Sequence, residues 1–197
     1  MTTSTTRATT ATTAARRKPA MRRAAGLGAA AIGAGLMLGA LGSAPTAEAA
    51  AHVRTLTLRL ASAPGEVANV RGASRENGAH VIQWPYSHAP NERWEPEATA
   101  NGYYLLRSEE SGKCLNVAGG GDEEAAPVIQ YTCGNYPNEQ WKFVHKGIGY
   151  QIVVRSSGKC LNVRGGVGQG NELIQFTCTP HGVDNDVWLP VWENASN

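Results

Sequence analysis

The chain has 197 residues, which is enough for one ordinary domain and too few for a large multidomain enzyme. It carries 18 Lys and Arg against 16 Asp and Glu, but residues 1–50 hold six of the basic groups and one of the acids. Residues 51–197 are left with 12 basic and 15 acidic groups, a net charge of −3. This balance excludes the basic surface that is typical of nucleic-acid-binding proteins, so no nucleic acid is expected as a partner.

Residues 1–49 have the features of a secretory signal peptide. A Thr/Ala-rich tract (1–15) precedes a basic segment (16–23), an uncharged run (24–42) and the small-residue triplet Ala47-Glu48-Ala49. This order predicts export and cleavage after Ala49 or within the neighbouring alanines, with Met21 as an alternative start. A membrane anchor is the competing interpretation, but Gly and Ala make the run weakly hydrophobic, so no membrane span is expected in the mature form. The prediction is a secreted, extracellular protein; the export route, Sec or Tat, stays open.

Residues 51–197 contain three copies of one sequence unit, repeated every 46 or 47 residues, with approximate limits 53–98, 99–145 and 146–197. A fixed period of this length indicates a repeat architecture. The shared steps are a Gly-x-x-x-Asn-Val segment, an apolar-Ile-Gln-aromatic segment and a closing Asn-acid-x-Trp segment. They lie at 65–70, 112–117 and 158–163; at 81–84, 128–131 and 173–176; and at 91–94, 138–141 and 185–188.

Each unit has the pattern of short β-strands. Residues 56–60 alternate Leu with Thr or Arg, which is typical of a strand with one buried face, and residues 150–154 take the same place before the third copy. Gly-rich links such as 119–121 and 165–166 provide the positive φ angles of tight turns. No amphipathic helix separates the strands, and three units are too few to close a propeller. An all-β assembly with three units around one core is therefore predicted.

The four cysteines follow the repeats. Cys114 and Cys133 lie in the second copy, and Cys160 and Cys178 occupy the same places in the third. Both positions lack cysteine in the first copy, where Val67 and Tyr86 stand. Only pairing within a unit explains this joint absence, so we expect the bridges Cys114–Cys133 and Cys160–Cys178 in an oxidising environment. A metal site is not expected, because no C-x-x-C occurs and the histidines share no position in the unit.

From about residue 53 to the end, the chain resembles the ricin-B-type β-trefoil lectins, which also occur as carbohydrate-binding modules. The resemblance rests on the order of the Cys-Leu-Asn-Val segment, the Gly-rich turn, the Gln-aromatic strand and the closing Asn-acid-x-Trp step. It implies a ricin-type β-trefoil domain over residues 53–197: a six-stranded barrel capped by three hairpins, with a pseudo-threefold axis.

The resemblance also implies one shallow sugar site per repeat. In the family, a first-strand carboxylate accepts hydrogen bonds from sugar hydroxyls, an aromatic ring stacks on the sugar, and an Asn near the closing Trp adds a contact. A pyranose suits this set, since its C–H face matches a ring and its hydroxyls need donors and acceptors. The matching positions are Asn69, Trp84 and Asn91; Asn116, Tyr131 and Asn138; and Asn162, Phe176 and Asn185.

Three departures from the family pattern stand out. Asn replaces the usual Asp in every repeat, which removes charge-assisted bonds that are roughly twice as strong as neutral ones. The closing Gln is acidic in each copy, as Glu92, Glu139 and Asp186. A Gln stands before each aromatic, at Gln83, Gln130 and Gln175, and is expected either to be buried and satisfied or to change the facing of the strand.

Alternatives to the sugar contacts also follow from the pattern. The recurring Trp94, Trp141 and Trp188 fit a threefold core better than a sugar platform. The aromatics Trp84, Tyr131 and Phe176 could pack across strands, and the three Asn before Val could form turns. No catalytic constellation is recognised, because all four cysteines are assigned to bridges, and no cofactor is expected.

The sequence therefore predicts a secreted, non-enzymatic protein that binds glycans or polysaccharides at weak multivalent sites. The alternative is a trefoil with inactive sugar sites that binds a protein, for example as an inhibitor of a secreted hydrolase. The sequence leaves open the sugar, the number of active sites and the oligomeric state.

Overall fold

The computed structural model describes residues 54–193; the predicted signal peptide lies outside this range. Within the described residues the backbone forms twelve strands and five short 3₁₀ helices, with no α-helix. The strands are β1 (Leu56–Leu60), β2 (Glu66–Val70), β3 (Val81–Pro85), β4 (Trp94–Ala98), β5 (Tyr104–Ser108), β6 (Cys114–Val117), β7 (Val128–Tyr131), β8 (Trp141–Lys146), β9 (Gly149–Val154), β10 (Cys160–Val163), β11 (Leu173–Phe176) and β12 (Trp188–Trp192). The 3₁₀ helices are η1 (Arg71–Ala73), η2 (Pro90–Glu92), η3 (Ala100–Gly102), η4 (Ala118–Gly120) and η5 (Pro137–Glu139).

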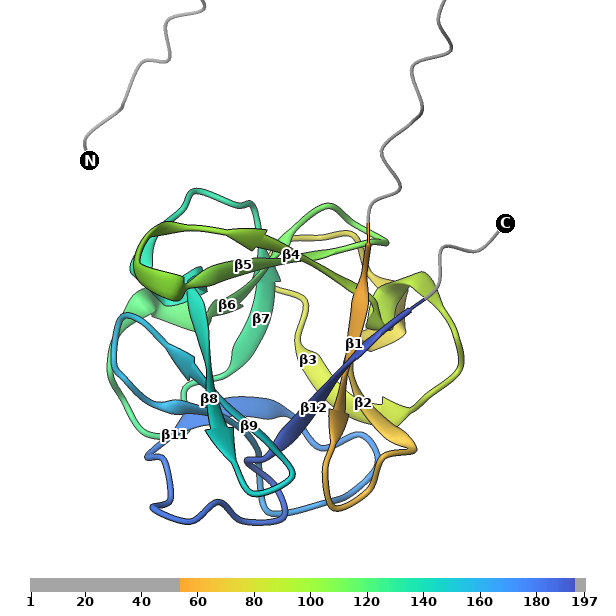
Figure 1. The fold of residues 1–197 in the computed structure, drawn as a ribbon. Coiled ribbons are helices and arrows are strands. Elements are labelled where there is room, and N and C mark those ends of the chain that lie inside the picture. Colours follow the sequence, from red (N-terminus) through yellow and green to blue (C-terminus); the bar gives the residue numbers. More distant parts are fainter. Residues whose placement is uncertain (1–53, 194–197) are drawn as a thin grey trace, which may run out of the picture. The chain divides into compact units, whose positions relative to one another are not determined.

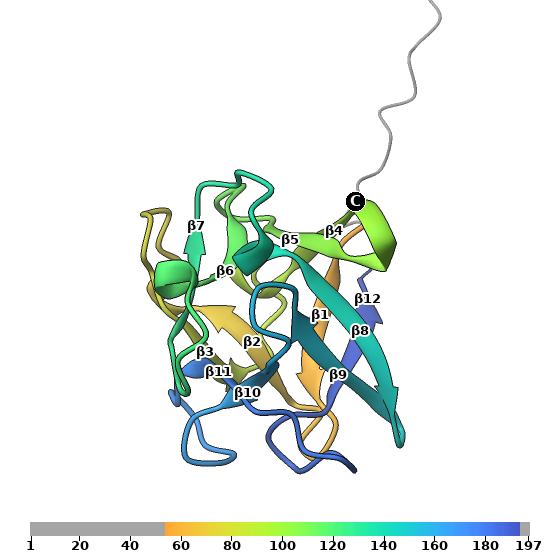
Figure 2. The same ribbon diagram turned by 90° about the vertical axis from the view of Figure 1, so that its left-hand side faces the viewer.

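Six strands close into a barrel. In ring order they are β1, β4, β5, β8, β9 and β12, and every neighbouring pair is antiparallel, including the β12–β1 pair that joins the two ends of the domain (Figure 1). The remaining strands form the hairpins β2–β3, β6–β7 and β10–β11, which gather on one side of the barrel in the turned view (Figure 2). Closure removes the exposed edges that an open sheet of this size would present. The predicted β-trefoil is confirmed.

The three tryptophans of the closing segments lie in the core. Trp94, Trp141 and Trp188 are all 0% exposed. Each indole Nε1 donates to a main-chain oxygen of the hairpin strand in its own repeat, at 3.2 Å to Ala68, 2.9 Å to Leu115 and 3.0 Å to Leu161. A buried indole N–H needs such a partner, and the shared geometry explains why Trp recurs at this position. The predicted core role of these residues is confirmed.

The first strand departs from simple alternation. Leu56, Leu58 and Leu60 face the core as expected, but Thr57 between them is also 0% exposed. The hydroxyl of Thr57 donates to a carboxylate oxygen of Glu193 at 2.9 Å, so the chain segment after β12 covers the predicted outer face of β1.

The glutamine before each aromatic is buried and ties one repeat to another. Gln130 is 0% exposed; its Nε2 donates to the main-chain oxygens of Ser74 (2.7 Å) and Glu76 (2.9 Å) in the first repeat. Its Oε1 accepts from the hydroxyl of Ser111 at 2.7 Å. Gln175 repeats this arrangement toward the second repeat, and Gln83 accepts from the backbone N–H of Gly168 in the third. The first of the two sequence-based alternatives, a buried and satisfied Gln, is therefore confirmed.

A glycine with positive φ lies two residues after the Asn-Val step in every repeat. Gly72, Gly119 and Gly165 have φ angles of 64°, 74° and 72°. This left-handed conformation is readily adopted by glycine and is costly for most other residues. The turn directs the chain away from each hairpin strand beside the candidate sugar site.

Candidate carbohydrate-binding sites

In the first repeat, the structure brings the three predicted sugar contacts together. Asn69 on β2, Trp84 on β3 and Asn91 in η2 line one pocket of about 560 Å³. The Trp84 side chain lies at the surface, with 40% of the residue exposed, while both asparagines are nearly buried. A flat ring beside fixed amides is an arrangement that suits a pyranose.

The two asparagines of each repeat are held against each other. The Nδ2 of Asn91 donates to the main-chain oxygen of Val70 (2.8 Å) and to Oδ1 of Asn69 (2.9 Å). The same two bonds recur in the other repeats, from Asn138 to Asn116 and Val117 and from Asn185 to Asn162 and Val163. With its Nδ2 engaged, each second Asn retains Oδ1 as an acceptor without a hydrogen bond among the described residues. The asparagines before Val are thus positioned by side-chain contacts.

The acidic residue of each closing segment fastens its loop from within. Glu92 is 0% exposed and accepts from the backbone N–H groups of Ser87 (2.9 Å) and Ala89 (3.1 Å) and from Nδ2 of Asn69 (3.3 Å). Glu139 receives equivalent bonds from Gly134, Tyr136 and Asn116. A buried carboxylate is tolerated because several donors replace its hydration. The acid in place of Gln, which the sequence left unexplained, therefore orients the first Asn of the site.

The third repeat departs from this scheme. Asp186 is one methylene shorter than Glu and makes no hydrogen bond with Asn162; Nε2 of Gln151 on β9 donates to it instead, at 2.9 Å. The pocket of this repeat is lined by Gly166, Val167, Gly182, Val183, Asp184 and Asn185. Phe176 is 43% exposed but does not line that pocket, so the predicted set of three residues is not united in one cavity.

The second repeat adds an aromatic residue that sequence reasoning missed. Its pocket, of about 310 Å³, contains Asn116, Tyr131 and Asn138, and also Tyr136. Tyr131 and Tyr136 are 47% and 64% exposed. Ala89 and Val183 take the place of Tyr136 in the other repeats, so a search for recurring residues passes over it. The sequence offered one indication of this residue: an aromatic side chain directly before the Pro-Asn-Glu segment, in the second repeat alone.

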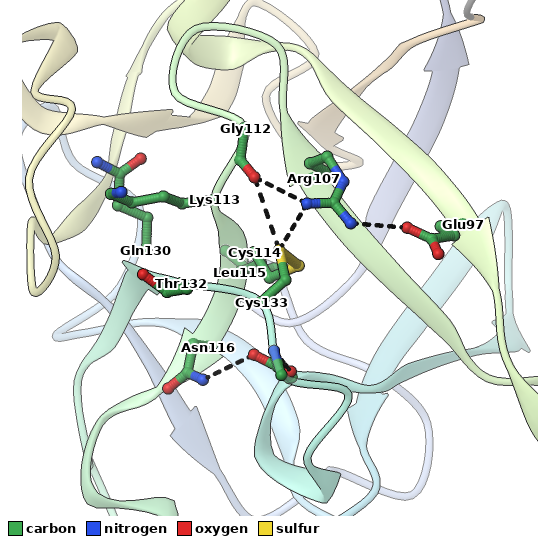
Figure 3. Close-up of a disulfide and its surroundings, with 12 residues drawn as sticks. Glu97, Arg107, Gly112, Lys113, Cys114, Leu115, Asn116, Gln130, Thr132 and Cys133 are labelled. Atoms are coloured by element: carbon green, nitrogen blue, oxygen red, sulfur yellow. Dashed lines mark hydrogen bonds and ion pairs between the residues drawn. A yellow bond between two sulfur atoms is a disulfide. The ribbon is translucent and has the colours of Figure 1, made fainter. Parts of the chain in front are cut away.

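Both predicted disulfides are present beside the candidate sites. Cys114–Cys133 and Cys160–Cys178 each have a Cα–Cα distance of 5.1 Å. Over the first bridge, Nη1 of Arg107 lies 2.9 Å from the main-chain oxygen of Gly112 and 3.1 Å from the sulfur of Cys133, while its Nη2 pairs with Glu97 at 2.8 Å (Figure 3). The pairing deduced from the repeats is confirmed.

In the first repeat, a polar cluster occupies the place of the missing bridge. Tyr86 stands where the second cysteine would be, and its hydroxyl donates to Glu193 at 2.7 Å. Arg59, whose guanidinium lies 4.0 Å from the centre of the Tyr86 ring, also pairs with Glu193 at 3.1 Å. Burial raises the pKa of Glu193, but hydrogen bonds from Tyr86, Thr57 and Arg59 outweigh this effect and lower it below its usual value. The cluster fastens the end of the domain to the first repeat.

Among residues 54–193, no group of three or more His, Cys, Asp or Glu side chains is placed to hold a metal ion. The same residues form no helix with the length and hydrophobicity of a membrane span.

Comparison with known proteins identifies the family. The model of the ricin-type beta-trefoil lectin domain-like family matches three overlapping stretches, residues 48–131, 97–176 and 137–196. The chain belongs to this family. A search of curated proteins found no match.

Similar solved structures carry the same fold. ThreeFoil, a designed threefold-symmetric protein, is 35% identical, with a TM-score of 0.66, over 70% of this chain and 97% of its own. An exo-β-1,3-galactanase from Clostridium thermocellum is 29% identical, with a TM-score of 0.64, over 71% of this chain but 30% of its own. The Rhizoctonia solani agglutinin is 18% identical, with a TM-score of 0.63, over 71% of this chain and 94% of its own. The shared fold therefore makes up nearly the whole of ThreeFoil and of the agglutinin, and about a third of the galactanase.

Proposed function

We propose that this trefoil is a secreted, non-enzymatic protein that binds glycans through its repeat sites, foremost those of the first and second repeats. The observation that carries the proposal is the recurring combination of an exposed aromatic and a fixed Asn pair in one pocket, at Trp84 with Asn69 and Asn91 and at Tyr131 with Asn116 and Asn138. Membership of a lectin-like family supports it. The third repeat is the weakest candidate, because Phe176 and Asn185 do not share a pocket.

Each site is expected to bind weakly. The pockets are open, and the Asn that replaces Asp supplies neutral rather than charge-assisted hydrogen bonds. We expect dissociation constants of about 1 mM per site, or about −4 kcal/mol. Retention on a polysaccharide would then come from several sites acting together. The two disulfides fit an extracellular location.

A glycan array followed by titration of the best ligand tests the proposal. We expect weaker binding in each of the variants Trp84→Ala, Tyr131→Ala and Asn138→Ala. The first two remove the aromatic ring on which a sugar would stack, and the third removes a hydrogen-bond acceptor. Trp192→Ala is the matched control, since Trp192 is an exposed aromatic (51%) outside the three sites. Binding that is indifferent to all three site changes would contradict a lectin function.

The second candidate is a trefoil with inactive sugar sites that binds a protein, such as a secreted hydrolase. An apolar pocket of about 360 Å³ favours it; this pocket lies where barrel strands meet and is lined by Leu56, Tyr104, Phe143, Tyr150 and Trp192 among others. Inhibition of a hydrolase that is lost in Trp192→Ala and retained in Trp84→Ala and Tyr131→Ala would support this candidate over the first.

A further inference from the structure

A basic residue lines the pocket of the first repeat, whereas no basic residue lines the pocket of the second. Arg71 opens η1 directly after β2 and lines the pocket with Asn69, Trp84 and Asn91. We propose that this site selects anionic saccharides, with Arg71 binding a carboxylate or sulfate group while Trp84 stacks on the ring. The inference rests on the proposed function and adds the class of ligand to it.

Arg71 is available for a ligand. Its side chain is 52% exposed, and its described partner is Glu172, at 3.7 Å, which is beyond hydrogen-bond distance. No hydrogen bond from its guanidinium occurs within residues 54–193. A guanidinium presents a planar fork of donors that matches carboxylate and sulfate oxygens, so an anionic sugar would supply the partners that Arg71 lacks.

Glu172 does not neutralise the local positive charge. The same carboxylate also lies 3.0 Å from Nδ1 of His80 and 3.6 Å from Nε of Arg164. One acid therefore serves two guanidinium groups and an imidazole, and the group keeps a net positive charge even when the histidine is neutral. An incoming anion meets an electrostatically favourable surface.

The acid that contacts the pocket residue Asn69 is common to all three repeats. Glu92 is fully buried, and its carboxylate already accepts hydrogen bonds from Ser87, Ala89 and Asn69. An acid occupies this place in every repeat, so it cannot make the first site different from the others. The difference lies at the position of Arg71.

The equivalent positions provide internal controls. Ala118 follows the Asn-Val step of the second repeat, and Arg164 follows that of the third. Nη2 of Arg164 donates to the main-chain oxygen of Ala125 at 2.8 Å, and Arg164 does not line the pocket of its own repeat. The second repeat thus has alanine at the position of Arg71. The third repeat has arginine there, but the guanidinium of Arg164 already donates a hydrogen bond within the protein.

The test compares acidic and neutral saccharides on the full chain. Titrations would use trigalacturonate with its methyl ester, and galactose 6-sulfate with galactose, against wild type, Arg71→Gln, Arg164→Gln and Trp84→Ala. We expect Arg71→Gln to lower the affinity for an acidic ligand about three- to tenfold and to leave the neutral partner unchanged. Arg164→Gln should leave the neutral partner unchanged and lower the affinity for the acidic ligand less than Arg71→Gln does, because it removes one charge near Glu172 but no residue that lines the pocket. Added salt should weaken the binding of the acidic saccharides and leave that of the neutral ones unchanged, because exposed charge pairs are screened.

The outcomes separate this inference from the function on which it rests. A loss confined to trigalacturonate assigns a carboxylate ligand, and a loss confined to the sulfated sugar assigns a sulfate. Equal affinity of wild type for the acidic and neutral partners, or an equal loss of both in Arg71→Gln, would overturn the inference while glycan binding stood. If no saccharide binds in a manner that depends on Trp84, the first-repeat sugar site itself fails and the inference fails with it.

Discussion

At the scale of one residue, the three core tryptophans are expected to contribute strongly to stability, and Trp141 represents them. It is fully buried, and its indole donates to Leu115. Trp141→Ala should lower the free energy of unfolding by about 3–5 kcal/mol, because it leaves a large cavity and an unpaired main-chain oxygen. Chemical denaturation measures this value, with the half-exposed Trp192→Ala as control. Equal losses in the two variants would mean that the core does not depend on the repeated Trp.

Glu124 gives a prediction about pH. Hydrogen bonds from Lys159 and Thr177 lower the pKa of its carboxyl from 4.5 to about 2. Because the folded pKa lies below the unfolded value, the ionised carboxylate contributes stability above about pH 4.5, and this contribution is lost as the pH falls through about 2. The stability difference between wild type and Glu124→Gln should therefore shrink over this window.

A direct measurement is the midpoint of the Glu124 carboxyl signal in NMR titration. A Glu124 midpoint near the ordinary value of 4.5 would contradict the contact with Lys159. The backbone N–H of Thr177 also donates to the Glu124 carboxylate. This hydrogen bond connects the second repeat, which contains Glu124, with the third, which contains Thr177.

At the scale of elements, the hairpins are joined to neighbouring repeats by the buried glutamines. Gln130→Leu would keep the volume and leave the main-chain oxygens of Ser74 and Glu76 without their donor. We expect a loss of about 1–3 kcal/mol in unfolding free energy, since two main-chain acceptors lose their hydrogen bonds to a buried side chain. Gln169→Leu, at an exposed position, should change stability by less than about 0.5 kcal/mol. A neutral Gln130→Leu would mean that packing alone joins the repeats.

At the scale of the whole domain, the proposed function implies that retention depends on the valency of the sites. The pockets of the first and second repeats are built from different hairpins, so the proposal treats them as two separate sites. Trp84→Ala and Tyr131→Ala should each leave measurable binding to a short oligosaccharide, whereas the double variant should lose it. On an immobilised polysaccharide, each single change should reduce retention by more than half, because avidity multiplies the affinities of linked sites. Strictly additive losses on the polymer would argue against joint action.

Much of this architecture follows from local patterns in the sequence. The repeat period and the recurring Trp predicted three β units around one core, because residues that pack around a common axis must recur at the same place. The joint absence of two cysteines from one unit predicted the bridges, and the resemblance to a known family added the trefoil. The Asn and aromatic positions of the first two sites were predicted from the family pattern for the same reason.

Other features depended on contacts between segments far apart in the chain. The burial of Thr57 under Glu193, the inter-repeat bonds of Gln130 and the separation of Phe176 from Asn185 have no local signature. The same holds for Arg71, which differs from Arg164 only in what surrounds it. Sequence periodicity fixes what the repeats share, because symmetry imposes it on each unit; only the tertiary structure decides how they differ, because those differences arise where one repeat meets the next.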